Sequence, residues 1–161
     1  YYAVVPAHSH DRAWRPTLEA AAYGIAAADY GPAGAVLMGL SAARLHGAIP
    51  RAIAVAVVAV DRNRPALSLA DRDASVRYVR RATSRLQAER MTTDMGTALV
   101  TTVEQTLLDL AHRPSLGGVP AEAHDAMRAL WSRADPDELE RIAVEQRLRA
   151  ALRRARDLAG E

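Results

Sequence analysis

Three residue types are missing from this chain of 161 residues: cysteine, phenylalanine and lysine. Without cysteine the protein cannot form disulfides, thiolate metal sites or a cysteine nucleophile, which fits a cytoplasmic protein. Without phenylalanine the core has to be built from aliphatic side chains and alanine, with Trp14, Trp131 and five tyrosines as the only large rings. The chain also lacks any apolar run close to about 18 residues, so the sequence predicts no membrane-spanning helix.

The absence of lysine leaves arginine as the only source of the 21 basic charges. It also disfavours nucleases of the Asp…Glu-x-Lys type. Arginine makes planar, bidentate contacts with phosphate and carboxylate groups, so an arginine surface suits a nucleic acid or an acidic partner. The formal net charge is only +2, so any basic surface has to be local.

Length and hydrophobic patterning predict one α+β domain, with a small mixed β-sheet packed with several α-helices and a helical C-terminal segment. Residues 53–60 form a nearly continuous apolar run that is typical of a central strand buried on both faces. Weaker patterns predict strands at residues 36–38, 76–80, 86–91 and 98–101. A charged turn is expected at residues 61–65 and a second turn at residues 94–96.

Capping signals predict where the helices begin and end. A helix is expected at residues 14–29 with Pro16 in its first turn, and another runs from an N-cap at Ser41 to Leu45, followed by Gly47. Thr101 or Thr102 starts a helix that reaches residue 111. Another helix is expected at residues 121–132, and a last helix or pair of helices runs from an N-cap at Asp135 to near residue 158. The expected apolar side of the last segment is Leu139, Ile142, Val144, Leu148, Leu152 and Leu158.

Few residue patterns suggest catalysis. His8 and His10 would share one face of a strand and could bind a metal, but no third ligand is evident. Asp71 and Asp73 form an Asp-x-Asp pair in a polar turn, without the preceding Gly-Ser turn at the spacing that Mg²⁺-dependent nucleotidyltransferases use. His46 follows a short helix, where it is expected to cap the helix end or to hydrogen-bond a carbonyl group.

Arginine clustering is the remaining signal. One group, Arg77, Arg80, Arg81, Arg85 and Arg90, has few acidic residues nearby, and Arg62 and Arg64 lie just upstream. Either an anion-facing surface or a solvated face explains this group. The second group interleaves with acidic residues over the last helices, which favours solvated, salt-bridged faces. Its members are Arg141, Arg147, Arg149, Arg153, Arg154 and Arg156.

Two segments carry a family resemblance: residues 40–48 (LSAARLHGA) and residues 100–111 (VTTVEQTLLDLA). In this order and spacing they resemble the C-terminal domain of the AbiEi antitoxins of the AbiE toxin–antitoxin systems. The resemblance implies a non-enzymatic antitoxin without catalytic residues or a cofactor. It also implies two partners, an AbiEii-like nucleotidyltransferase toxin and operator DNA, through which the protein represses its own operon.

In that family a winged-helix DNA-binding domain precedes the antitoxin domain, and its wing ends in a strand similar to residues 1–6 (YYAVVP). We therefore expect residues 1–6 to end such a domain and residues 7–161 to form the antitoxin domain. The candidate contacts to nucleic acid or toxin are the residues of the first arginine group and its upstream neighbours: Arg77, Arg80, Arg81, Arg85, Arg62 and Arg64.

Two other classes of function remain. One is a transcriptional regulator whose C-terminal domain senses a ligand or dimerises and has no toxin partner. The other is a divalent-metal enzyme that depends on Asp71. A toxin gene beside this gene would distinguish the antitoxin from the regulator, and loss of activity in an Asp71→Asn variant would indicate the enzyme.

Overall fold

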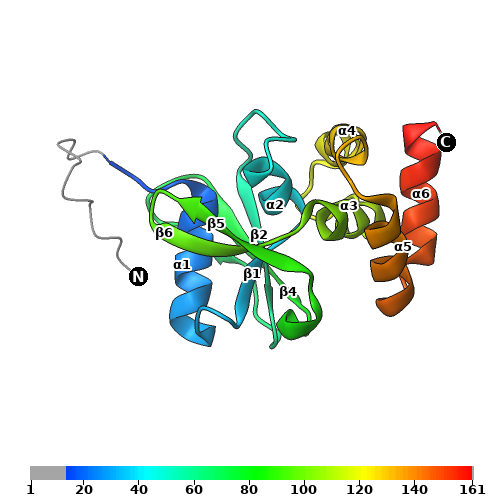
Figure 1. Ribbon diagram of the computed structural model, residues 1–161. Helices are drawn as coiled ribbons and strands as arrows, with labels where there is room; N and C mark the ends of the chain where they lie inside the picture. Colours follow the sequence, from blue (N-terminus) through cyan, green and yellow to red (C-terminus); the bar gives the residue numbers. More distant parts are fainter. Residues whose placement is uncertain (1–13, 161) are drawn as a thin grey trace.

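A six-stranded mixed β-sheet forms the centre of the computed structural model, which describes residues 14–160 (Figure 1). The strand order is β3-β4-β2-β1-β6-β5. Helices α1 and α2 pack against the sheet and the remaining helices pack with one another at one end of it, so the predicted α+β class with a mixed sheet is confirmed. Residues 1–6, predicted to end a preceding domain, and His8 and His10, considered as metal ligands, lie outside the described residues. The strands are β1 (Ala35–Leu37), β2 (Val55–Val60), β3 (Leu67–Ser68), β4 (Ser75–Arg80), β5 (Ala88–Thr93) and β6 (Gly96–Thr101).

The predicted central strand is β2. It pairs in parallel with β4, from Val55 opposite Ser75 to Val60 opposite Arg80, and antiparallel with β1. Five of its six residues are buried, because helices or loops cover both faces. The two-residue strand β3 was not predicted. Its pairing with β4 is what defines it as a strand, and two residues are too few for a periodic pattern.

Helix α1 (Leu18–Tyr30) covers one face of the sheet. It begins four residues later than predicted, because Thr17 is the N-cap and accepts a hydrogen bond from the Ala20 N–H. Pro16 therefore precedes the helix and is not in its first turn. The small side chains of Ala22 and Ala26 are fully buried in a cluster that includes the inward residues of β2 and β4, which places the helix close to the sheet.

Helix α2 (Gly39–Leu45) corrects the predicted role of Ser41. The N-cap is Met38, and Ser41 is buried inside the helix, where its Oγ accepts a hydrogen bond from the Val57 N–H of β2 at 2.8 Å. The side chain thus connects α2 to the sheet. Gly47, at φ +74°, follows the helix as predicted.

A hairpin and a short 3-10 helix connect β4 to the C-terminal helices. The 3-10 helix η1 (Thr83–Arg85) follows β4, and β5 pairs antiparallel with β6 over their whole length. Strand β5 begins two residues later than the predicted 86–91, because Leu86 packs into the apolar cluster that includes Val57 and Val79.

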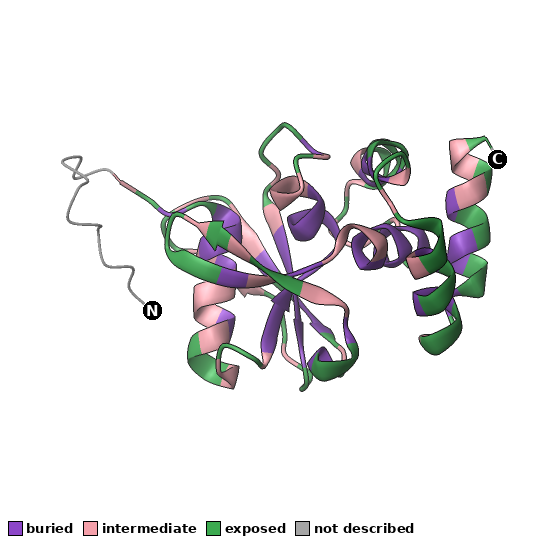
Figure 2. Ribbon diagram, viewed as in Figure 1, coloured by how far each residue is buried: buried purple, intermediate pink, exposed green. Residues whose placement is uncertain are grey.

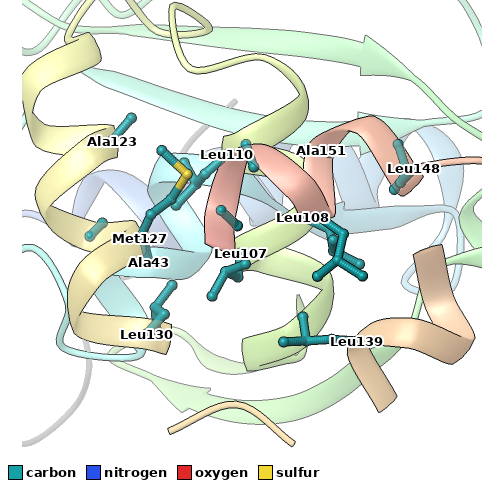
Figure 3. Packing of buried hydrophobic residues seen from close by; sticks show 14 of the residues in the cluster. Ala43, Leu107, Leu108, Leu110, Ala123, Met127, Leu130, Leu139, Leu148 and Ala151 are labelled. Carbon is teal, nitrogen blue, oxygen red and sulfur yellow. The ribbon is translucent and has the colours of Figure 1, made fainter. Parts of the chain in front are cut away.

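The four helices that follow β6 in the chain pack together on the right in Figure 1. They are α3 (Val103–His112), α4 (Pro120–Trp131), α5 (Pro136–Glu145) and α6 (Arg149–Ala159). The predicted N-caps are confirmed: Thr102 accepts from the Gln105 N–H, and Asp135 accepts from the first turn of α5. Their inward faces form an aliphatic cluster that includes Leu107, Leu108 and Leu130, all fully buried (Figures 2 and 3).

One predicted core residue of this helical part is wrong. Val144 is 50% exposed, because α5 buries only one narrow face, through Leu139, Ile142 and Ala143.

No helix between residues 14 and 160 combines the length and hydrophobicity that a membrane crossing requires.

Candidate functional site

The end of β4 and the residues that follow it bring three members of the first arginine group, Arg80, Arg81 and Arg85, to the edge of the helical part. Arg80 is the last strand residue, and the N–H of Arg81 donates to the Val60 carbonyl, which extends the pairing with β2. The next turn is held by Asp61, whose carboxylate accepts a hydrogen bond from the Thr83 N–H at 2.9 Å. This contact fixes η1, which carries Arg85, close behind the strand end.

The turn between α5 and α6 supplies the other side of the site. The Leu148 N–H donates to the Ala143 carbonyl at 2.8 Å and the Arg147 N–H to the Val144 carbonyl, the hydrogen-bond pattern of a Schellman motif. In this motif the residue after the C-cap has a positive φ and is usually glycine. Here it is Arg147, at φ +60° and the only non-glycine residue with a positive φ in the described chain. The left-handed conformation costs a residue with a Cβ roughly 1 kcal/mol relative to glycine.

A cavity of about 570 Å³ lies between these two segments. We call it the arginine pocket. Its lining residues come from the end of β4, from η1 and from the α5–α6 turn: Arg80, Arg81, Ala82, Arg85, Leu86, Glu145, Gln146 and Arg147. The fold thus joins three members of the first arginine group to one member of the second.

A pair of glutamine side chains, one of them fully buried, supports the wall of the arginine pocket. Gln105 and Gln146 exchange side-chain hydrogen bonds at 2.6 and 3.2 Å, and Gln146 also donates to the Arg85 carbonyl at 3.0 Å. Gln105 is fully buried on α3. The pair therefore couples η1 to the α5–α6 turn through α3.

Arg81 is held by this same network. Its Nη1 lies 3.1 Å from Asp109 Oδ1, and its Nη2 donates to Gln146 Oε1 at 2.8 Å. The side chain of Asp109 is 1% exposed, and its Oδ2 accepts no hydrogen bond from the described residues. Burial raises the pKa of Asp109 from 3.8 to about 6, although the charge of Arg81 favours ionisation. At neutral pH the carboxylate is thus ionised, and it fixes the Arg81 guanidinium.

The other three arginines of the pocket have free guanidinium groups. Within residues 14–160, the side chains of Arg80, Arg85 and Arg147 form no hydrogen bond or ion pair. The one carboxylate in the lining, Glu145, already binds Arg141 at 2.8 Å. The pocket therefore carries an excess of positive charge.

The remaining predicted contact residues lie outside the arginine pocket. Arg77 is exposed on β4, and Arg62 is exposed in the turn after β2. Arg64 forms an ion pair with Asp29, and its guanidinium carbon lies 4.5 Å from the centre of the Tyr78 ring. Arg64 thus contributes to packing against α1 and β4, whereas Arg77 and Arg62 remain accessible.

Two of the residues considered for catalysis, His46 and Asp71, have structural contacts. His46 is the C-cap of α2, and its Nε2 donates to the Thr101 carbonyl at 2.7 Å, which confirms the interpretation of this histidine as a structural residue. Asp71 binds its neighbour Arg72, and this hydrogen bond lowers the pKa of Asp71. Between residues 14 and 160 no three His, Asp or Glu side chains gather in a way that would hold a metal ion.

Sequence reasoning did not single out Gln105, Asp109, Gln146 or Arg147 as site residues. Gln105 and Asp109 are four residues apart and so lie on one face of α3, a polar pair on an otherwise apolar helix. That pattern could have indicated a buried polar contact. The partners of that pair, however, come from β4 and from the α5–α6 turn, which no local pattern connects.

Comparison with known proteins identifies a family. No curated protein matches the chain. A family model described as the AbiEi antitoxin C-terminal domain matches residues 34–161. The match includes the four C-terminal helices, and with them the α5–α6 turn that borders the arginine pocket. The match covers well over half of the chain, and the chain therefore belongs to the AbiEi antitoxin C-terminal domain family.

Proposed function

We propose that this antitoxin domain counteracts a cognate nucleotidyltransferase-like toxin and, together with a winged-helix domain, represses its own operon by binding operator DNA. The observation that carries the proposal is the family match over residues 34–161. The free arginines on the surface support it, because a nucleic acid or an acidic protein surface would complement them.

The predicted contact residues take two roles in this proposal. Arg77, Arg80, Arg85 and Arg62 contact the partner, since their side chains are exposed. Arg81 and Arg64 hold neighbouring elements in place through their ion pairs with Asp109 and Asp29, and they add to the local positive charge. The proposed contacts are electrostatic, so binding should weaken as ionic strength rises.

Co-expression with the product of the adjacent gene tests the proposal. We expect the full-length protein to restore growth and an Arg77→Glu/Arg80→Glu variant to restore it less well, or to bind operator DNA less tightly. The matched control is Arg149→Glu/Arg153→Glu, which makes the same charge change at exposed positions of α6. It should behave like the unmodified protein.

Each outcome has a distinct meaning. Failure of the full-length protein to protect would refute the antitoxin activity and favour a regulator without a toxin partner. Equal protection and equal DNA affinity in both double variants would remove Arg77 and Arg80 from the contact surface. Protection without co-purification of the two proteins would show that neutralisation does not require a stable complex.

A further inference from the structure

We propose that the arginine pocket binds a terminal phosphate group, as carried by a nucleotide or by the end of a nucleic-acid strand. Of the exposed arginines proposed as partner contacts, Arg80 and Arg85 line this pocket, whereas Arg77 and Arg62 do not. The inference goes beyond the antitoxin role and does not depend on the identity of the toxin.

The first argument is the convergence of free positive charge. Arg80, Arg85 and Arg147 come from three different elements, line one cavity and have no side-chain partner among the described residues. Guanidinium groups stay charged at any physiological pH, so their mutual repulsion is relieved when an anion binds between them. A planar guanidinium also matches two oxygens of a phosphate group at once.

The second argument is the conformation of Arg147. The Schellman motif at the α5–α6 turn needs a residue that tolerates a positive φ, and it is completed by backbone hydrogen bonds alone. Nothing in the turn requires an arginine side chain, and an arginine is strained there relative to glycine. A long cationic side chain that occupies such a position and lines the pocket points to a role for that side chain outside the turn.

The third argument is that the pocket is rigid. Arg81 is fixed by Asp109 and Gln146, and Gln146 also holds the Arg85 carbonyl. The wall therefore keeps η1 and the α5–α6 turn at a fixed separation before any ligand binds. Pre-organised groups lose less conformational entropy on binding, which favours affinity for a small ligand.

Charge and shape favour a terminal phosphate over other anions. A terminal phosphate carries a charge between about −1.5 and −2 near neutral pH. A phosphodiester within a strand or a single carboxylate carries only one negative charge, which leaves more of the positive charge of Arg80, Arg85 and Arg147 unbalanced. The volume of about 570 Å³ would admit a mononucleotide or the last nucleotide of a strand. A concave pocket is less accessible to phosphates in the middle of a duplex.

Titration calorimetry with the complete chain tests the proposal. The probes are inorganic phosphate, a nucleoside 5′-triphosphate, and a single-stranded oligonucleotide with either a 5′-phosphate or a 5′-hydroxyl group. We expect the oligonucleotide with a 5′-phosphate to bind about tenfold or more tightly than the one with a 5′-hydroxyl group, because the phosphate adds a charge-assisted hydrogen bond. Binding of inorganic phosphate alone would also support the site, and tighter binding of the triphosphate or the oligonucleotide would identify which source supplies the phosphate.

The decisive variant is Arg147→Gly. Glycine suits the left-handed position, so the urea midpoint of this variant should be equal to or higher than that of the unmodified protein, while phosphate affinity falls about tenfold. Arg85→Ala should lose affinity similarly. The control is Arg153→Ala, which removes the same charge from an exposed position of α6 that does not line the pocket. The phosphate affinity of this variant should differ from that of the unmodified protein by less than about twofold.

Two results would overturn the inference. One is that neither inorganic phosphate nor the triphosphate binds and the two oligonucleotides bind equally well. The other is unchanged phosphate affinity in both Arg147→Gly and Arg85→Ala. Toxin protection is measured separately. A protein that protects cells but binds no phosphate refutes this site alone, and a protein that binds phosphate but does not protect refutes the antitoxin activity alone.

Discussion

The buried carboxylate of Asp109 makes the stability of this domain depend on pH, and Asp109→Asn should remove that dependence. The pKa of Asp109 is raised from 3.8 to about 6 in the folded protein, because burial outweighs the favourable charge of Arg81. The unfolded chain exposes this group to water, where its pKa returns to about 3.9. Folding therefore favours the protonated form of Asp109.

The direction of the pH effect follows from proton binding. Below pH 4 Asp109 is protonated in both states and carries no pH-dependent penalty. Between about pH 4 and pH 6 the unfolded chain releases this proton while the folded protein retains it, so the free energy of unfolding falls as the pH rises. The difference between the two pKa values corresponds to a decrease of about 3 kcal/mol in the free energy of unfolding. This decrease is complete above about pH 6.

Urea unfolding from pH 4 to pH 8 measures this loss. Other groups also titrate in this range. For each protein we therefore take the change in the free energy of unfolding between pH 4 and pH 8, and we compare this change between the unmodified protein and Asp109→Asn. Asparagine has nearly the shape of the protonated carboxyl group. The substitution weakens the contacts with Arg81 and Gln105, but the free energy lost in these contacts does not vary over this pH range. We expect the unmodified protein to lose about 3 kcal/mol more than the variant. Parallel pH profiles for the two proteins would refute the reasoning.

Three other substitutions test the packing of the fold by urea unfolding. Ser41→Ala leaves the buried Val57 N–H without its acceptor and should cost about 1–3 kcal/mol, and a neutral result would show that this bond adds no stability. Leu108→Ala opens a cavity in the helical cluster and should cost about 2–5 kcal/mol, so a loss below about 1 kcal/mol would contradict the close packing around that side chain. Asp135→Ala removes the N-cap of α5 and should cost about 1 kcal/mol, whereas Asp137→Ala, which removes a nearby carboxylate but leaves the cap in place, should cost less. Equal losses in these last two variants would mean that the cap hydrogen bonds contribute nothing.

Local sequence determined the parts of the fold that depend on near neighbours. The apolar run at residues 53–60 became the buried strand β2, and Thr102 and Asp135 began helices through bonds to residues two or three positions away. Gly47 followed a helix as predicted. Such features depend on backbone preferences and short-range hydrogen bonds, so they can be recognised in a short stretch of sequence.

Tertiary contacts changed other expectations. Ser41 has the chemistry of an N-cap, but its hydroxyl group binds Val57 of a neighbouring strand, 16 residues away. Val144 has an apolar side chain that remains exposed, because α5 packs through only one narrow face. Strand β3 exists only because β4 pairs with it.

The arginine pocket shows the same division. The sequence alone determined that the basic charge is all arginine and that Arg80, Arg81 and Arg85 follow one strand closely. Only the tertiary structure brought Arg147 to them, across more than sixty residues, and paired Arg81 with a carboxylate on α3. A site of this kind depends on distances between elements, which are set by the packing of the whole core and not by any local pattern.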